Sequence, residues 1–255
     1  GPTPAGKVVT HAWPSVGAVM RADTKGVWFV LPKLQVGGIE RNWLRMIYQC
    51  RQWGIHVELI LVEERGALLS DIPVEVPVHV LGCPFKALFP LRLAALIRRK
   101  RPGFLISAFD DVNLMVALAQ RLSDPGTHVL LSNNTALSIA HRSARGIERI
   151  KTRLVRKLLP WAFNGAHAVV AVSKDLSMFL DFHRESISVI YNPVVERDPG
   201  GYEMHQSDQA FPGQARRVVF VGRFVELKDI PTLLAAFAAL LCERKAQLTM
   251  VGDGP

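Results

Sequence analysis

Cysteine is scarce in this sequence, and no hydrophobic run is long enough to cross a membrane. The three cysteines, Cys50, Cys83 and Cys242, are odd in number and far apart, which predicts reduced thiols rather than a disulfide framework. The longest clean apolar run, Leu233–Leu241, is much shorter than the roughly 20 residues that a bilayer requires. Residues 1–25 lack the unbroken apolar core of a signal peptide. We therefore expect a cytoplasmic protein.

Metal-binding patterns are also missing. The eight histidines form no His-Glu-x-x-His or other zinc pattern, and the cysteines lack metal-ligand spacing. We expect no metal ion and no cofactor. The 255 residues, 49% hydrophobic and 21% charged, instead suit one or two globular domains with a sizeable core.

The most informative stretch is the C-terminal one, which reads as strand, basic turn, helix and strand. The short apolar run Val218–Val221 ends at a glycine, and Pro231 suits the first turn of the helix that follows. Arg223 and Lys228 lie between this strand and this helix. Ligands of open α/β sheets collect at this edge, where helix N-termini also offer N–H groups to anions. The two cations are therefore candidates for phosphate binding, although a lone Arg or Lys is usually just a solvated surface residue.

The wider pattern favours the functional interpretation. Val-Gly-Arg-Phe-Val-x-x-Lys-Asp-Ile from Val221, followed by a strand and Val-Gly-Asp-Gly-Pro, resembles the donor-binding domain of family 4 glycosyltransferases, retaining sugar-nucleotide enzymes of GT-B fold. The resemblance implies that Arg223 and Lys228 hold the diphosphate of a UDP- or GDP-linked sugar. They would then be catalytic, because they neutralise charge that develops on the leaving group without a metal ion. Gly252, Asp253 and Gly254 are candidate donor or acceptor contacts.

A second loop near the N-terminus fits the same family. The strand Val27–Leu31 runs through Pro-Lys-Leu-Gln-Val-Gly-Gly into a helix expected over Ile39–Trp53. Paired glycines such as Gly37 and Gly38 let a backbone approach a ligand closely, but they are more often an ordinary turn. Gly-Gly-Ile-Glu-Arg resembles the family loop that approaches donor phosphate and acceptor. That resemblance implies a diphosphate-binding role for the two glycines and a donor or acceptor contact for Glu40.

Strands and helices alternate along the remaining chain, which predicts a doubly wound parallel sheet of α/β class. The fold expected is GT-B-like: a Rossmann-like N-terminal domain plus the first βαβ unit of a second such domain. We expect a poorly ordered extension over 1–25, the acceptor-side domain over 26–195, a linker over 196–214 and an incomplete nucleotide-sugar domain over 215–255. The further elements predicted are strands at His56–Val62, Val76–Leu81, Phe104–Ser107, His128–Leu131, Ala168–Val172, Ser188–Tyr191 and Leu248–Val251, and helices at Pro90–Arg101, Val112–Leu122, Glu148–Phe163 and Lys174–Phe182.

Polar residues after two of these strands are further candidates. Asn133 and Asn134 follow the strand that ends at Leu131, so we expect their side chains to face the interdomain cleft. Many family members carry His-Asn near this place, and asparagine cannot shuttle a proton at neutral pH. Sugar contact and a structural turn both remain open. Asp110 is a candidate contact as well, although capping of the next helix by Asp110 or Asp111 is the favoured single role.

The net charge of +9 is unevenly distributed. The segment over residues 142–163 combines apolar residues with many cations, and Arg98–Arg101 is a second basic cluster. A helix with basic and apolar faces can lie on an anionic membrane, as family members with lipid-linked acceptors do, or its apolar face can simply pack on the sheet. Arg149, Arg153, Arg156 and Lys157 are the candidate membrane-facing residues. The cations of the segment are Arg142, Arg145, Arg149, Lys151, Arg153, Arg156 and Lys157.

The expected function is that of a bacterial, peripheral membrane enzyme of polysaccharide biosynthesis, at the inner face of the cytoplasmic membrane. It would move a hexose from a nucleoside diphosphate to a hydroxyl of a glycan or lipid-linked acceptor. Residues 215–255 are shorter than a typical domain, and the family's glutamate pair for the donor sugar is absent from them. The chain therefore resembles a C-terminally truncated member, which we expect to be weak or inactive. An inactive GT-B-like scaffold is the alternative, and a basic nucleic-acid-binding protein is disfavoured because no recognition motif accompanies the charge.

Overall fold

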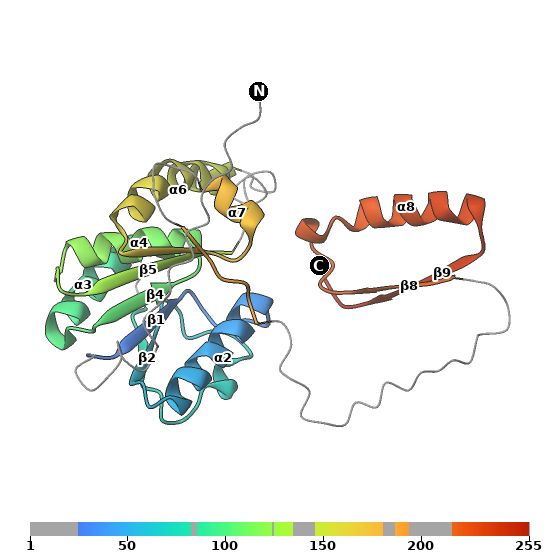
Figure 1. Ribbon diagram of the computed structural model, residues 1–255. Helices are drawn as coiled ribbons and strands as arrows, with labels where there is room; N and C mark the ends of the chain where they lie inside the picture. The colour runs from blue at the N-terminus through green and yellow to red at the C-terminus, as the bar shows by residue number, and fades with distance from the viewer. Residues whose placement is uncertain are drawn as a thin grey trace. The chain divides into compact units, whose positions relative to one another are not determined.

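The computed structural model describes residues 25–82, 86–123, 125–134, 146–180, 187–193 and 216–254. These residues fall into two compact units (Figure 1). Unit 1 contains the described residues up to 193, and unit 2 contains residues 216–254. The expected N-terminal extension, apart from Lys25, and the expected linker over 196–214 lie outside the described residues, as does Cys83.

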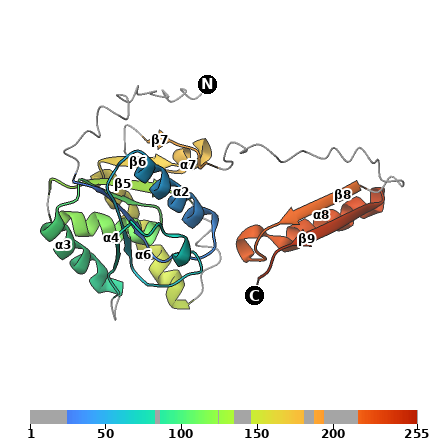
Figure 2. The same ribbon diagram turned by 90° about the horizontal axis from the view of Figure 1, so that it is seen from below.

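Unit 1 is a seven-stranded parallel sheet in the order β3-β2-β1-β4-β5-β6-β7. Helices cover both of its faces. α2 packs on one face, and α3, α4 and α6 pack on the other (Figures 1 and 2). The doubly wound α/β architecture expected from the alternation is confirmed. The elements in chain order are β1 (Val27–Leu31), α2 (Gly38–Gln52), β2 (Val57–Leu61), η1 (Leu69–Asp71), β3 (Val78–Val80), η2 (Lys86–Leu88), α3 (Phe89–Lys100), β4 (Phe104–Ser107), α4 (Asp110–Arg121), β5 (His128–Asn133), α6 (Gly146–Gly165), β6 (Ala168–Ala171), α7 (Lys174–Phe179) and β7 (Ser188–Val189).

Two apolar layers hold the unit 1 sheet between its helices. Every residue of β1 and of β2 is buried, as expected for strands covered on both faces. On one face, Phe29 packs edge-on against Trp43 of α2, with ring centroids 5.3 Å apart. The opposite face packs Trp28 and Val30 against residues of α3, α4 and α6. The central strands are therefore fixed in place, and so are the residues at their carboxyl ends.

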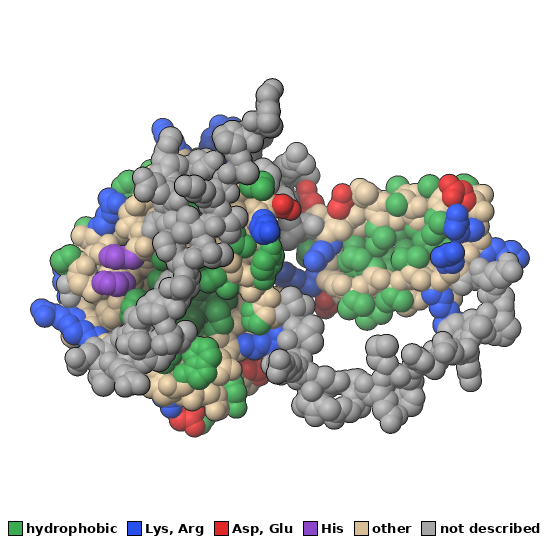
Figure 3. Space-filling model, viewed as in Figure 1, with side chains coloured by type: hydrophobic (Ala, Val, Ile, Leu, Met, Phe, Trp, Pro, Cys, Tyr) green, Lys and Arg blue, Asp and Glu red, His purple; other side chains and the backbone are tan. Residues whose placement is uncertain are grey.

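Unit 2 is one βαβ unit, made of β8 (Arg216–Val221), η3 (Glu226–Lys228), α8 (Ile230–Glu243) and β9 (Ala246–Val251). Its two strands are parallel and in register, with Val221 beside Val251. Hydrophobic side chains reach the surface of this unit (Figure 3), and Val219 and Val221 are 62% and 73% exposed. The predicted strand, turn, helix and strand are all present.

Several boundaries differ from the expected ones for local reasons. β5 runs two residues beyond Leu131, because Ser132 and Asn133 continue the pairing with β6. α4 begins two residues before the expected Val112, because Phe109 is the last residue with an extended backbone. α6 is longer than expected at both ends.

Candidate functional site

The basic turn of unit 2 begins where β8 ends. Gly222 donates its N–H to the carbonyl of Val251, and η3 carries the chain to the start of α8. The side chains of Arg223 and Lys228 are both exposed in this turn. The Lys228 Cε atom lies 3.9 Å from the position that a Cβ would occupy on Gly222, so this side chain extends back across the strand end. Two cations are thus presented at the carboxyl edge of the small sheet.

The start of α8 adds donors to the same edge. Asp229 is the N-cap, with φ 47°, and its side chain makes no capping hydrogen bond. Pro231 lies in the first turn as predicted, and the helix dipole places partial positive charge there. An anion could therefore meet backbone N–H groups as well as the two side-chain cations.

The turn after β9 packs directly on the turn after β8. The Phe224 N–H donates to the Asp253 carbonyl over 2.7 Å. A Cβ on Gly252 would fall on the carbonyl of Gly222, and one on Gly254 would fall on the backbone of Phe224. The structure therefore brings Gly252, Asp253 and Gly254 beside Arg223, and it explains both glycines by close backbone packing.

The glycine pair of unit 1 lies at the start of α2. Gly37 is the N-cap with an extended backbone, and its carbonyl accepts the Arg41 N–H. A Cβ on Gly37 would collide with the Glu40 carboxylate, which folds back over this residue. A Cβ on Gly38 would meet nothing within 4 Å. The backbone at Gly38 therefore borders open space, whereas Gly37 is covered by Glu40.

Asp110 and Asn133 meet at the carboxyl ends of β4 and β5. The Asn133 Nδ2 donates to Asp110 Oδ1 over 3.1 Å. Burial raises the pKa of Asp110 to about 6, against the lowering effect of the bond from Asn133 and with the help of the nearby Asp111 charge. The other amide atom of Asn133, Oδ1, is buried and has no hydrogen-bond partner in the described part of the chain.

Two expectations about this cluster are wrong. Neither Asp110 nor Asp111 is the N-cap of α4, which is Phe109; both lie in the first turn, where Asp111 Oδ1 accepts the Val112 N–H over 3.0 Å. Asn133 does not present an exposed side chain, because it is only 1% exposed. It continues the alternation of β5 and lies on the same buried face as Val129 and Leu131.

Neighbouring polar residues that sequence reasoning missed complete this edge of the sheet. Ser107 Oγ donates to Asn113 Oδ1 over 2.6 Å, and Asn113 Nδ2 donates to the Ser132 carbonyl over 3.0 Å. Asn134 donates to the Ala108 carbonyl and accepts a bond of 3.5 Å from Asn192. An asparagine at a buried position of an otherwise apolar helix face was the signal that could have revealed Asn113.

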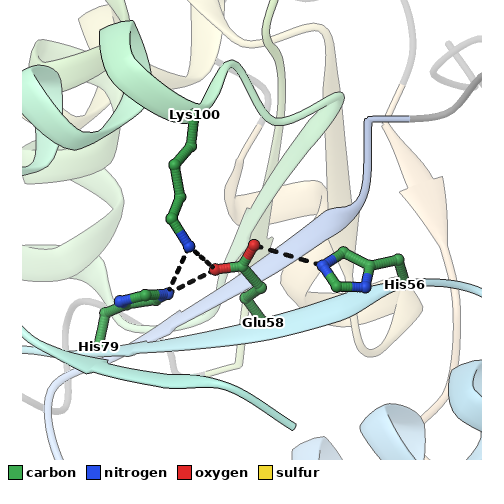
Figure 4. A network of polar contacts seen from close by, with 4 residues as sticks. All are labelled: His56, Glu58, His79 and Lys100. Atoms are coloured by element: carbon green, nitrogen blue, oxygen red, sulfur yellow. Dashed lines mark hydrogen bonds and ion pairs between the residues drawn. The ribbon is translucent and has the colours of Figure 1, made fainter.

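A second polar cluster was not predicted. The carboxylate of Glu58 in β2 contacts His56, His79 of β3 and Lys100 of α3 (Figure 4). Burial tends to raise the pKa of Glu58, but bonds from Lys100, His79 and His56 outweigh it and lower the pKa to about 2. Glu58 stands near the start of its strand and Lys100 ends its helix, so this cluster lies away from the carboxyl edge. Its role is to tie these elements together.

The basic helix α6 has two apolar faces rather than one. Leu159, Ala162 and Phe163 are buried in the core. Four other apolar residues at helical spacing stay exposed, by 71%, 56%, 39% and 38%: Ile150, Leu154, Leu158 and Trp161. The candidate cations Arg153, Arg156 and Lys157 are exposed as well, and the side chain of Arg149 lies outside the described ones. None of the described helices is both long and apolar enough to span a bilayer.

Comparison with known proteins places this geometry in context. Residues 36–197, more than half of the chain, match the model of Glycosyltransferase Family 4. No curated protein matches significantly.

Solved structures share the fold at low sequence identity. HepE of Anabaena, in complex with UDP and glucose, has 19% identity and a TM-score of 0.63. The match covers 91% of this chain and 62% of the HepE chain. The apo lipopolysaccharide outer core galactosyltransferase WaaB has 17% identity, covers 90% and 61%, and has a TM-score of 0.59. Sucrose-phosphate synthase from Thermosynechococcus elongatus has 13% identity, covers 88% and 61%, and has a TM-score of 0.62. The expected GT-B-like α/β fold is confirmed, and the chain spans about three-fifths of the length of these proteins.

Proposed function

The chain belongs to glycosyltransferase family 4, and we propose that it is part of an enzyme that moves a hexose from a nucleoside diphosphate to a hydroxyl. The acceptor is a bacterial glycan or lipid-linked sugar, and transfer retains the anomeric configuration. The bond between the anomeric carbon and the diphosphate breaks, the glycosidic bond to the acceptor oxygen forms, and negative charge develops on the leaving nucleoside diphosphate, which takes up the proton of the acceptor hydroxyl.

The observation that carries this proposal is the basic turn after β8. Arg223 and Lys228 are exposed there beside the start of α8, where two full charges and the helix dipole act on the same anion. We assign both residues to the diphosphate of a UDP- or GDP-linked donor, as catalytic residues that stabilise its departure. This electrostatic role needs no metal ion.

Both units contribute further proposed contacts. Gly38 borders open space at the start of α2, which supports its role in binding the diphosphate. Gly37, which is covered by Glu40, is proposed for the same role from the family resemblance alone. Glu40, Asp110 and Asn134 are proposed to contact the donor sugar or the acceptor, and Asn133 would act from behind Asp110. In unit 2, Gly252, Asp253 and Gly254 pack on the turn that carries Arg223 and are proposed as donor or acceptor contacts.

The exposed face of α6 supports a peripheral contact with the cytoplasmic membrane. Leu154 and Leu158 are exposed at helical spacing, and Arg153 and Lys157 lie beside them. Apolar side chains can enter the headgroup layer while each cation near an anionic surface contributes about 1 kcal/mol. A lipid-linked acceptor would be reached at such a surface.

The proposal is tested by calorimetric titration of the 255-residue chain with UDP and with GDP. Lys228→Ala removes a cation from the proposed diphosphate site, so the affinity should fall by at least about tenfold, the effect expected when a charged hydrogen bond of 1.5 to 3 kcal/mol is lost. Lys245→Ala is the matched control, because this lysine is an exposed cation of unit 2 at the opposite end of the sheet. Equal affinities of the two variants would contradict the assignment.

A further inference from the structure

The pair formed by Asp110 and Asn133 has hydrogen-bonding capacity that the described residues do not use. Asn133 Nδ2 donates a hydrogen bond to one carboxylate oxygen of Asp110. Among the described residues, the amide oxygen of Asn133 has no partner, although Asn133 is 1% exposed. None of them donates a hydrogen bond to the second oxygen of Asp110 either. A buried acceptor that lacks a donor is destabilising. Of these two acceptors, only the second oxygen of Asp110 belongs to a partly exposed side chain, so it is the one that an outside donor can reach.

The chemistry of the missing group follows from these atoms. An ionised carboxylate and an amide carbonyl can only accept hydrogen bonds. The matching group must donate, and it must reach Asp110, which is only partly buried. A sugar hydroxyl meets both conditions without adding charge.

We propose that ionised Asp110, held in position by Asn133, accepts a hydrogen bond from a hydroxyl of a hexose ligand, and that protonation of this carboxyl weakens the binding. The inference rests on the proposed function, because a glycosyltransferase substrate supplies such hydroxyls. A carboxylate forms a charge-assisted bond about twice as strong as that of the neutral acid. Asp110 is thus the ligand-contacting residue and Asn133 is a positioning residue.

The neighbours of Asp110 determine the pH range over which hexose binding should weaken. Burial, which raises the pKa of Asp110, is opposed by neutral Asn133 from β5 and reinforced by the charge of Asp111 on α4 itself. No charged side chain from β1, β4, β5 or α6 acts on this pKa among the described residues. With the pKa near 6, hexose affinity should fall several-fold between neutral pH and pH 5, because the ionised fraction falls about tenfold while the neutral acid keeps a weaker bond.

The test follows the carboxyl carbon of Asp110 by NMR through a pH titration of the purified chain. Methyl glycosides of glucose, galactose and mannose are the probes, and glucosamine tests a cationic donor instead. A hexoside that binds the ionised form must lower the midpoint of Asp110. If glucosamine alone moves the midpoint, or if none of the neutral hexosides does, the inference is overturned.

Three variants separate ligand binding from a purely structural role. Asp111→Asn should lower the Asp110 midpoint and move the pH dependence of hexoside binding down with it, whereas Asn133→Ala should move both upward. Asp110→Asn should abolish the pH dependence. Asp175→Asn is the control, because it removes an exposed first-turn carboxylate from another helix. If the variants shift the midpoint while hexosides do not respond, the pair is structural and the inference fails.

UDP titration of the same samples distinguishes the two proposals. If UDP binds and the hexosides leave Asp110 unmoved, only the inference is wrong. If neither UDP nor GDP binds while a hexoside lowers the midpoint, the nucleotide assignment fails and the hydroxyl site stands.

Discussion

The Nζ atom of Lys100 lies 2.8 Å from Oε2 of Glu58, and it joins the end of α3 to the start of β2. His79 contacts the same carboxylate oxygen from the edge strand β3. The Glu58 side chain is 9% exposed, so its charge depends on these partners. Removing one partner of a buried pair leaves the other without compensation, which is more damaging than replacing both.

Glu58→Gln should therefore destabilise the protein at neutral pH by about 1 to 3 kcal/mol. The folded state lowers the pKa of Glu58 from 4.5 to about 2. Its contribution is present above pH 4.5 and is lost as the pH falls through 2, because the unfolded chain takes up the proton first. Urea denaturation at pH 7 and at pH 3 should show a smaller difference between variant and parent at pH 3. Glu64→Gln, an exposed carboxylate nearby in sequence, should change stability little at either pH, and an equal loss in both variants would contradict the network.

Gly252→Ala should loosen the carboxyl edge of unit 2. Its new methyl group would collide with the carbonyl of Gly222, so the two turns must separate at a cost of about 1 to 3 kcal/mol. Amide hydrogen exchange should become faster at Gly222 and Phe224, whose N–H groups bond to Val251 and Asp253. Gly38→Ala is the control for backbone packing, since its methyl group would enter open space. Unchanged exchange in Gly252→Ala would show that the turns are not tightly packed.

Charge reversal on α6 should weaken membrane binding. Arg153→Glu or Lys157→Glu should lower the partition onto vesicles of mixed anionic and neutral lipid by at least about fivefold, because each cation contributes about 1 kcal/mol. Raising the salt concentration should reduce the difference, since salt screens exposed charges. Arg244→Glu, on unit 2, is the matched control, because Arg244 is exposed and lies outside α6. Equal partition of the parent protein onto purely neutral vesicles would contradict a role for these cations.

Local patterns were sufficient to predict most elements. The strand Phe104–Ser107 was predicted with its observed limits, because an apolar run starts directly after Gly103 and Ser107 is the first polar residue in it. The start of α7 was also predicted, and Ser173 caps it by accepting the Leu176 N–H. Asp110 looked like a cap for the same sequence reason, but Phe109 already has the extended backbone of the N-cap. The first helical residue depends on how the preceding strand ends, which composition does not reveal.

The candidate site likewise has a part that the sequence predicts and a part that only the structure reveals. Arg223 and Lys228 are recognisable from sequence because they stand five residues apart in one turn, between one strand and one helix. The contact between Asp110 and Asn133 joins residues 23 positions apart. It depends on the register that places Ser107 beside Leu131.

The amino-acid sequence by itself determined the α/β class, the order of the elements, the family resemblance and the basic turn, because periodicity and turn residues act over short distances. Only the tertiary structure decided which polar groups are buried away from water. Burial made Asn133 a core residue, raised the pKa of Asp110 and surrounded Glu58 with three partners. The packing of α6 on the sheet leaves four of its apolar residues exposed, because the sheet can cover only one side of a helix.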